Sequence, residues 1–231
     1  MYKRQVLLIG VSYLIGQLTA GQDVKIIKDL GLAAISVFGL LMAVFIGVGL
    51  VWKEVERRSI YSLLAKPVRR GEVVAGKYAG LALTLLVNMA AMAAAYFAVL
   101  AYMGGADPRL LVAIVLIAAE LLLVTAVALF FSTFSTPFLS TVLTLGLWVI
   151  GRFNSGLRDF GVVTESAAAS WLTRGIYYVF PNFSAFDVKL QAVHGLPVPA
   201  AYVATTLAYA GVYVALLLAG AIAIFSRRDF K

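Results

Sequence analysis

Long apolar runs with few or no charges set the class of this chain. Residues 30–51 form 22 consecutive positions without Asp, Glu, Lys or Arg. A helix that crosses a membrane needs about 20 such residues. Similar runs follow at residues 74–101, 110–131, 138–152 and 200–225. Soluble domains are about 45–50% apolar, whereas this chain is 62% hydrophobic and 13% charged. We therefore expect an all-α membrane protein with one transmembrane domain over residues 1–231.

The start of the chain has two interpretations. Residues 6–20 are mostly apolar and follow a short basic segment, although 15 residues are few for a span. A cleaved signal peptide has the same layout. Leu18 occupies a place where such a peptide needs a small residue, so we favour a retained first span. The sequence then predicts six spans with both termini on one side of the membrane, at residues 6–20, 30–51, 74–101, 110–131, 138–152 and 200–225.

The distribution of basic residues predicts the orientation. With six alternating spans, 12 of the 19 Lys and Arg fall on the side that holds both termini and the segment 51–77. The other side holds seven, among them Arg152, together with six acids that nearly cancel their charge. The positive-inside rule places the richer side in the cytoplasm. The net charge of +8 is therefore mainly a membrane-surface charge, and no soluble basic platform for nucleic acid is present.

The segment 51–77 is the longest charged stretch between two apolar runs, with seven Lys or Arg and three Glu. Its apolar and charged residues fall on two sides of a helical wheel, and Pro67 predicts a helix end near Lys66. The chain is predicted to turn at residues 68–71, between this helix and the next span. Glu72 then suits the first turn of the next helix. An interfacial anchor explains this pattern, and so does a helix that docks into a partner's groove. The residues alone leave the two interpretations equal.

Two polar residues fall inside predicted spans. Glu120 lies near the middle of 110–131, where an ionised acid costs about 2.5–3.5 kcal/mol, so it is expected to be protonated, paired or facing a cavity. A pathway or coupling role competes with a structural hydrogen bond to a neighbouring helix, which we favour, with Asn88 as a candidate partner.

The connection 153–199 carries an aromatic segment with helical spacing that Pro181 ends. We expect a helix in the outer membrane interface, acting either as a gate or as a plain anchor. Ser184 and Asp187 have the spacing of a capping box that opens a second short helix. His194 is the single histidine, and we interpret it as a loop residue rather than a metal ligand. The gate candidates are Trp171, Tyr177, Tyr178 and Phe180.

Enzyme chemistry finds little support in the sequence. Residues 71–78, GEVVAGKY, miss the phosphate-loop pattern because Tyr78 stands where Ser or Thr would bind magnesium, and a span follows at once. The chain has no cysteine, no H-E-x-x-H and no G-x-S-x-G motif. We expect no catalytic residue, metal or cofactor in this chain. A proton-coupled secondary carrier using Glu120, or another transporter without an ATPase, is the alternative to an ATP-driven permease, although repeated halves are missing.

The stretch KEVERRSIYSLLAKPVRRGEVVAGKYAGL resembles the signature of type-2 ABC export permeases. Further similar segments are GQDVKIIKDLGLAAISVFGLL, FFSTFSTP, YYVFPNFSAFDVK and the SRRDF end, so the resemblance covers nearly the whole chain. The nearest subgroup resembles permeases for multicopper-enzyme and nitrous-oxide-reductase maturation. Members usually begin with an interfacial helix, whereas only residues 1–5 precede the first apolar run here.

The resemblance implies a six-span permease of the prokaryotic cytoplasmic membrane that works as a dimer. An ATP-binding subunit beneath each half would hold ATP and magnesium and push on a coupling helix, and a periplasmic accessory protein is a further partner that the outer segment allows. The cargo is not specified by the sequence. The residues that this implies for coupling are Lys53, Glu54, Glu56, Arg57, Arg58, Tyr61, Leu63, Leu64 and Lys66.

Overall fold

The computed structural model describes residues 23–56, 70–153 and 180–227, and this part of the chain is helical without a strand. Four helices are long: α2 (Asp23–Glu56), α4 (Arg70–Tyr102), α5 (Arg109–Ser132) and α10 (Ala200–Arg227). Three are shorter: α6 (Pro137–Arg152), the 3-10 helix η1 (Phe183–Phe186) and α9 (Lys189–Val193). The expected all-α class is confirmed for these residues.

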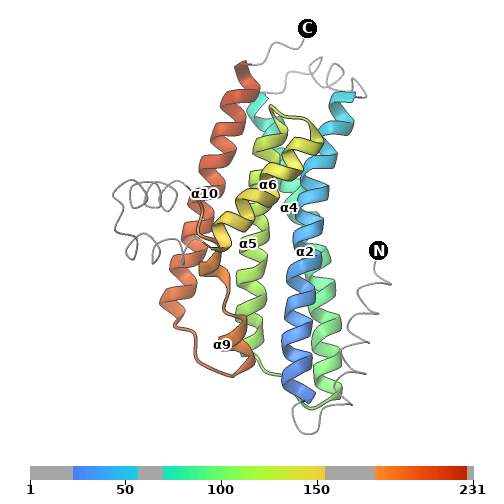
Figure 1. The fold of residues 1–231 in the computed structure, drawn as a ribbon, viewed down its shortest axis with the longest axis vertical. Helices are drawn as coiled ribbons and strands as arrows, with labels where there is room; N and C mark the ends of the chain where they lie inside the picture. The colour runs from blue at the N-terminus through green and yellow to red at the C-terminus, as the bar shows by residue number, and fades with distance from the viewer. Residues whose placement is uncertain (1–22, 57–69, 154–179, 228–231) are drawn as a thin grey trace, which may run out of the picture.

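Helix α5 forms the centre of the bundle. It is apolar around its whole circumference, which is typical of a helix enclosed by others. It packs against α2, α4, α6, α9, α10 and η1 (Figure 1). In its most apolar 18-residue window 72% is buried, against 11% in α10, so α10 presents most of its apolar surface outward. The core therefore lies around α5, and α10 and α4 lie at the periphery.

Four of the predicted spans correspond to helices that are long and apolar enough to cross a membrane, namely α2, α4, α5 and α10. The predicted span 138–152 corresponds to α6, whose 16 residues extend only about 24 Å at 1.5 Å per residue. That is less than the hydrocarbon thickness of about 30 Å. In Figure 1, α6 begins beside the end of α5 and finishes partway along it. Of the five predicted spans within the described part, four are thus full-length candidates and one is short, whereas the predicted span 6–20 lies outside the described part.

Helix α2 is longer at both ends than the predicted span 30–51. Residues 21–29 were expected to form a polar turn, but the helix begins at Asp23 because nothing in 23–30 breaks it and Ile27 packs into the core. At its other end the helix continues through Glu56, so Lys53, Glu54 and Glu56 extend the span. The coupling helix that the resemblance implies from about Lys53 to Lys66 therefore does not begin as a separate element, because Lys53 to Glu56 belong to α2. Positions 57–69 lie outside the described part.

The chain breaks between helices occur where the sequence indicates them. Helix α5 ends at Ser132, and α6 begins at Pro137, which suits a first helical turn. Gly104 adopts a φ of +67°, in the left-handed region that favours glycine, in the turn between α4 and α5. Helix α4 begins at Arg70, with Glu72 in its first turn as predicted. The predicted turn at residues 68–71 is shorter than expected, because residues 70 and 71 already belong to α4.

The described helix ends fall into two groups along the long axis. The end of α2, the start of α4, the α5–α6 turn and the end of α10 lie together at the top of Figure 1. The start of α2, the α4–α5 turn and α9 lie at the opposite end. The end of α2 and the start of α4, which flank the basic segment 57–69, thus lie at the same end of the bundle as the C-terminal end of α10.

Candidate functional site

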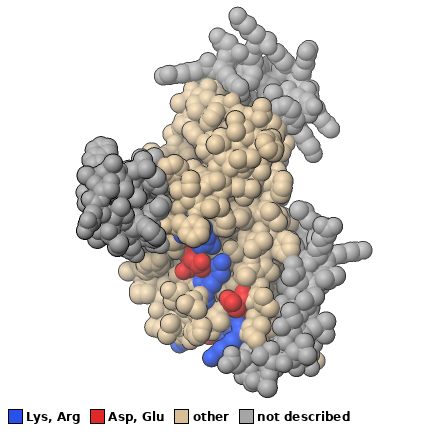
Figure 2. All heavy atoms as spheres, in the orientation of Figure 1, with Lys and Arg blue, Asp and Glu red and all other residues tan. Residues whose placement is uncertain are grey.

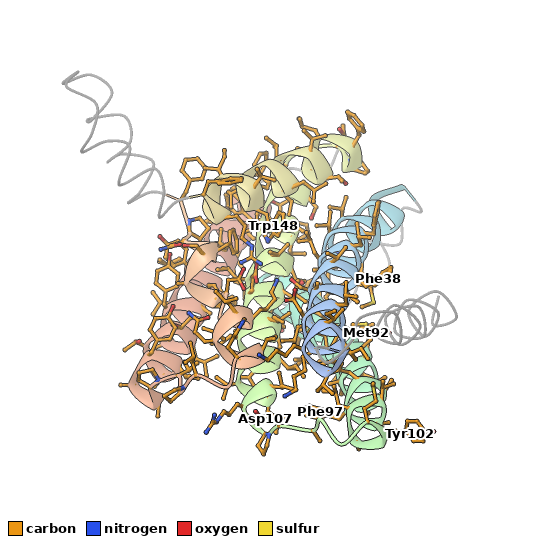
Figure 3. The ribbon with its side chains drawn as sticks, turned by 60° about the horizontal axis from the view of Figure 1, so that its bottom comes forward. Phe38, Met92, Phe97, Tyr102, Asp107 and Trp148 are labelled. Atoms are coloured by element: carbon orange, nitrogen blue, oxygen red, sulfur yellow. The ribbon has the colours of Figure 1, made fainter. Side chains whose placement is uncertain are left out.

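Glu120 of α5 is the centre of a polar cluster inside the bundle. It is 1% exposed, and its Oε1 accepts a hydrogen bond of 2.8 Å from Nε1 of Trp148 on α6. Arg152, one turn further along α6, places Nη2 3.5 Å from the same oxygen. Residues four apart lie on one helix face, so α6 directs both side chains at Glu120. Figure 3 shows Trp148 on the side of α6 that faces the bundle.

The second oxygen of Glu120 has no such partner. Oε2 is buried without a hydrogen bond. Nearly all buried polar atoms in proteins are hydrogen-bonded, so this oxygen is an exception among the described residues. The cluster therefore combines a buried ion pair with one carboxylate oxygen that has no hydrogen bond within the described part of the chain.

Arg152 joins this buried carboxylate to a second one near the surface. Its Nη1 donates to Oδ2 of Asp187 at 3.1 Å, and its guanidinium lies 5.5 Å from the ring centre of Trp148. Asp187 in turn has Lys189 Nζ 3.9 Å from Oδ1. Alternating charges thus run from Glu120 through Arg152 and Asp187 to Lys189. We call these four residues the charged strip.

The segment after residue 180 positions the outer half of the charged strip. Asn182 caps η1, because its side chain accepts from the backbone N–H of Ser184 at 3.1 Å. Asp187 follows η1 directly and also accepts from the N–H of Lys189 at 3.4 Å. The predicted capping box of Ser184 and Asp187 is wrong, since Ser184 lies within η1 and the carboxylate of Asp187 is turned to basic partners.

Helix α10 holds η1 in place through two tyrosines. The hydroxyl of Tyr202 donates to the carbonyl of Ala185 at 2.6 Å. The hydroxyl of Tyr209 accepts from the backbone N–H of Asn182 at 2.8 Å. A small open pocket of about 270 Å³ lies between η1 and α10, lined by Asn182, Ala185, Thr205, Thr206 and Tyr209.

A second group of polar contacts ties the helices at the opposite end from the basic segment. Lys28 Nζ of α2 lies 4.0 Å from Asp107 in the α4–α5 turn. Tyr96 of α4 donates to the carbonyl of Lys28 at 2.9 Å. Arg109 donates to the carbonyl of Gly195, just after α9. These contacts join α2, α4, α5 and the segment after α9 at one end of the bundle.

The other predicted site residues are only partly within the described part. Asn88 donates to the carbonyl of Thr84 in its own helix, so Glu120 pairs with Trp148 and Arg152 instead of the expected Asn88. Phe180 is described and half-buried at the start of the segment leading to η1. Of the coupling candidates, Lys53, Glu54 and Glu56 end α2. The remaining coupling and gate candidates lie outside the described residues: Arg57, Arg58, Tyr61, Leu63, Leu64, Lys66, Trp171, Tyr177 and Tyr178.

Metal chemistry finds no cluster within the described residues, where no group of three His, Asp or Glu is close enough to hold an ion. His194 is exposed, and its Nδ1 lies 3.0 Å from the carbonyl of Leu190 one turn earlier. It thus ends α9 as a loop residue.

Sequence reasoning missed Trp148, Asp187 and Lys189, and it assigned Arg152 to the outer surface. A usable signal was present for two of them, because Trp148 and Arg152 are four residues apart at the end of an apolar run. Asp187 and Lys189 carry no such signal, since only the tertiary fold brings Asp187, 35 positions beyond Arg152, back to it, and Lys189 contacts Asp187.

The chain matches, over residues 7–230, the family model described as ABC-2 family transporter protein. A comparison with curated proteins finds no match. The matched range spans all the described helices, including the four long apolar ones and the charged strip. Because the match covers nearly the whole chain and the helices are membrane-spanning in length and composition, the protein is an integral membrane transport component and belongs to the ABC-2 transporter family.

Proposed function

We propose that this chain is the permease subunit of an ATP-driven exporter, moved by ATP hydrolysis on a separate subunit. The observation that carries the proposal is the family match over residues 7–230. It is supported by the arrangement of the basic segment, whose flanking helix ends lie together at one end of the bundle. Basic segments next to membrane spans attract anionic headgroups and protein partners at the membrane surface.

Helices α2 and α4 supply the mechanical link in this proposal. They are continuous over 34 and 33 residues, so each extends about 50 Å from the basic segment to the far end. A push on residues 53–66 would tilt both helices together. Helix α2 packs along α5, which carries Glu120, so tilting would reach the charged strip.

Co-purification tests the ATPase partner. The tagged chain is isolated from its own host membranes in mild detergent, as wild type and as Arg57→Glu/Arg58→Glu. We expect a nucleotide-binding protein in stoichiometric amount with wild type and its loss in the variant. Arg227→Glu/Arg228→Glu makes the same charge change in another basic pair of the sequence and should retain the partner. An abundant, stable wild-type chain without an ATPase would refute the proposal.

The finer parts of the proposal rest on the sequence resemblance. They are a dimer of permease chains, the prokaryotic cytoplasmic membrane with both termini inside, a periplasmic accessory protein, and the subgroup that serves multicopper-enzyme maturation. Two differently tagged copies expressed together test the dimer. Recovery of one tag with the other supports it, and complete separation of the tags contradicts it.

The alternative is a proton-coupled carrier, and one observation favours it. Oε2 of Glu120 is buried without a hydrogen-bond partner, as expected of a group that takes up a proton during a cycle. This alternative requires that purified chain in vesicles transports without any ATPase and that Glu120→Gln abolishes the proton dependence. Transport that needs ATP and the partner excludes it.

A further inference from the structure

The charged strip leads from a fully buried residue to an exposed one. Glu120 has 2% of its side-chain surface exposed, Arg152 has 16% and Asp187 has 42%. Lys189 follows with 18%. Figure 2 shows acidic and basic side chains alternating on one face of the lower half, between surfaces that are otherwise uncharged or not described.

The position of the charged strip along α5 places it deep within the span. Glu120 lies eleven residues beyond Arg109 in a helix of 24, which is about 16 Å from that end at 1.5 Å per residue. Arg152 contacts Glu120 directly and Asp187 contacts Arg152 directly. The buried end of the charged strip therefore lies near the middle of α5, and its outer end lies between η1 and α9, of which α9 is at the end of the bundle that carries the α4–α5 turn.

Lipid is an unsuitable neighbour for these groups. Charged side chains within a membrane span face the bundle interior or a water-filled cavity, since hydrocarbon offers them no hydrogen bonds. The outward surfaces of α4 and α10 contrast with the charged strip, because their exposed side chains, such as Leu83, Val212 and Leu216, are aliphatic.

We propose that the outer part of the charged strip lines a water-filled path that enters from the end carrying Asp107 and finishes at Arg152, against the buried Glu120, and that admits small hydrophilic ions of either sign. Because α6 ends at Arg152, the wall of this path is formed beyond that point by η1 and α9 and not by a continued helix. The acids and bases of the charged strip are equal in number, so the path has no strong preference for one sign. As a route for polar cargo the path rests on the proposed permease function, but its water content does not.

Cysteine accessibility tests the proposal directly, because the chain has no cysteine of its own. Asp187→Cys and Lys189→Cys are compared with Val212→Cys, which lies mid-way along α10 and is 60% exposed. Cells or right-side-out vesicles are treated with impermeant methanethiosulfonates, one cationic and one anionic. If neither substitution at the charged strip accumulates, Leu190→Cys, which is 68% exposed on α9, takes their place.

We expect both cysteines of the charged strip to react at least about tenfold faster than Val212→Cys, because the reactive thiolate forms in water. The ratio of anionic to cationic reagent rates should be higher at Asp187→Cys, where an acid is lost, than at Lys189→Cys. Rates equal to that of Val212→Cys would overturn the proposal. Ready oxidative cross-linking of Asp187→Cys between two copies would also overturn it and assign the charged strip to a chain–chain contact. The readout needs no ATPase, so it is independent of the co-purification result.

Discussion

At the scale of single residues, the burial of Glu120 depends on partners supplied by one turn of α6. Trp148 donates to Oε1 and Arg152 supplies a positive charge to the same oxygen. Removing one member of a buried pair leaves an uncompensated charge, whereas replacing both with neutral groups removes the problem. Arg152 also holds Asp187, so its loss affects two acids.

A double-mutant cycle measures this dependence. Arg152→Gln alone should destabilise the detergent-solubilised protein by about 3 kcal/mol, because Glu120 stays buried without its cation. Glu120→Gln should cost less, since an amide oxygen can still accept from Trp148. The double variant should lose less stability than the sum of the two single losses. The difference is a coupling free energy of about 0.5–3 kcal/mol. Additive losses in unfolding titrations would show that the pair does not interact.

The hydroxyl of Tyr96 provides a second residue-scale prediction. Its hydrogen bond to the Lys28 carbonyl joins α4 to α2 in a fully buried position. Tyr96→Phe should lower the free energy of unfolding by about 0.5–1.7 kcal/mol, the range seen for hydrogen bonds between membrane helices. Tyr102→Phe is the matched control on the same helix, because Tyr102 is 84% exposed. Equal effects of the two substitutions in an unfolding titration would contradict the assigned contact.

At the scale of elements, charge-free apolar length predicts α2, α4, α5 and α10 well, because a long apolar run has few alternatives to a spanning helix. Helix ends were predicted less well. The start of α2 depends on Ile27 packing into the core, which a polar local composition conceals. For α6 the sequence indicates a helix of marginal length for a span. Nothing in that local sequence predicts that the end of α6 contacts Glu120.

The contact between α2 and α5 depends on small residues that allow close approach. A Cβ added to Gly47 would lie 2.8 Å from the Cβ of Ala128 on α5, whereas one added to Gly49 meets nothing within 4 Å. Gly47→Ala should therefore force the two helices apart and lower thermal stability. Gly49→Ala should leave the stability unchanged or raise the free energy of unfolding by about 0.5–1 kcal/mol, because alanine replaces a glycine within a helix. Thermal unfolding of both variants in one detergent compares them, and equal stability would show that the helices tolerate the added methyl.

At the scale of the whole molecule, the two ends of the bundle differ in charge and are predicted to face different compartments. The α5–α6 turn lies with the ends of the basic segment, and the α4–α5 turn lies at the opposite end. The basic residues predict that the first of these ends is cytoplasmic. Local sequence supports that orientation, whereas the meeting of Arg152 with Asp187 needs the complete fold.

Single cysteines in the two turns test the orientation. Ala106 and Thr136 are both exposed, one in each turn, and neither is part of the charged strip. Ala106→Cys should be labelled by an impermeant maleimide in intact cells. Thr136→Cys should be labelled only after the membrane is permeabilised. The reverse pattern would invert the predicted topology, and labelling of both in intact cells would place the two turns on one side.

The early end of α6 has a mechanical consequence. A continuous helix transmits a tilt along its whole length, because every turn is hydrogen-bonded to the next. Helix α6 ends at Arg152. Its contact with the segment formed by η1 and α9 depends on the Arg152–Asp187 pair and on the packing of Gly151 against Phe183. Helix α6 and the segment formed by η1 and α9 are therefore two short units joined by these contacts, whereas α2 and α4 are continuous helices. Because Tyr202 and Tyr209 of α10 also hydrogen-bond to the η1 segment, breaking the Arg152–Asp187 pair would loosen α6 from that segment while α10 continues to hold it.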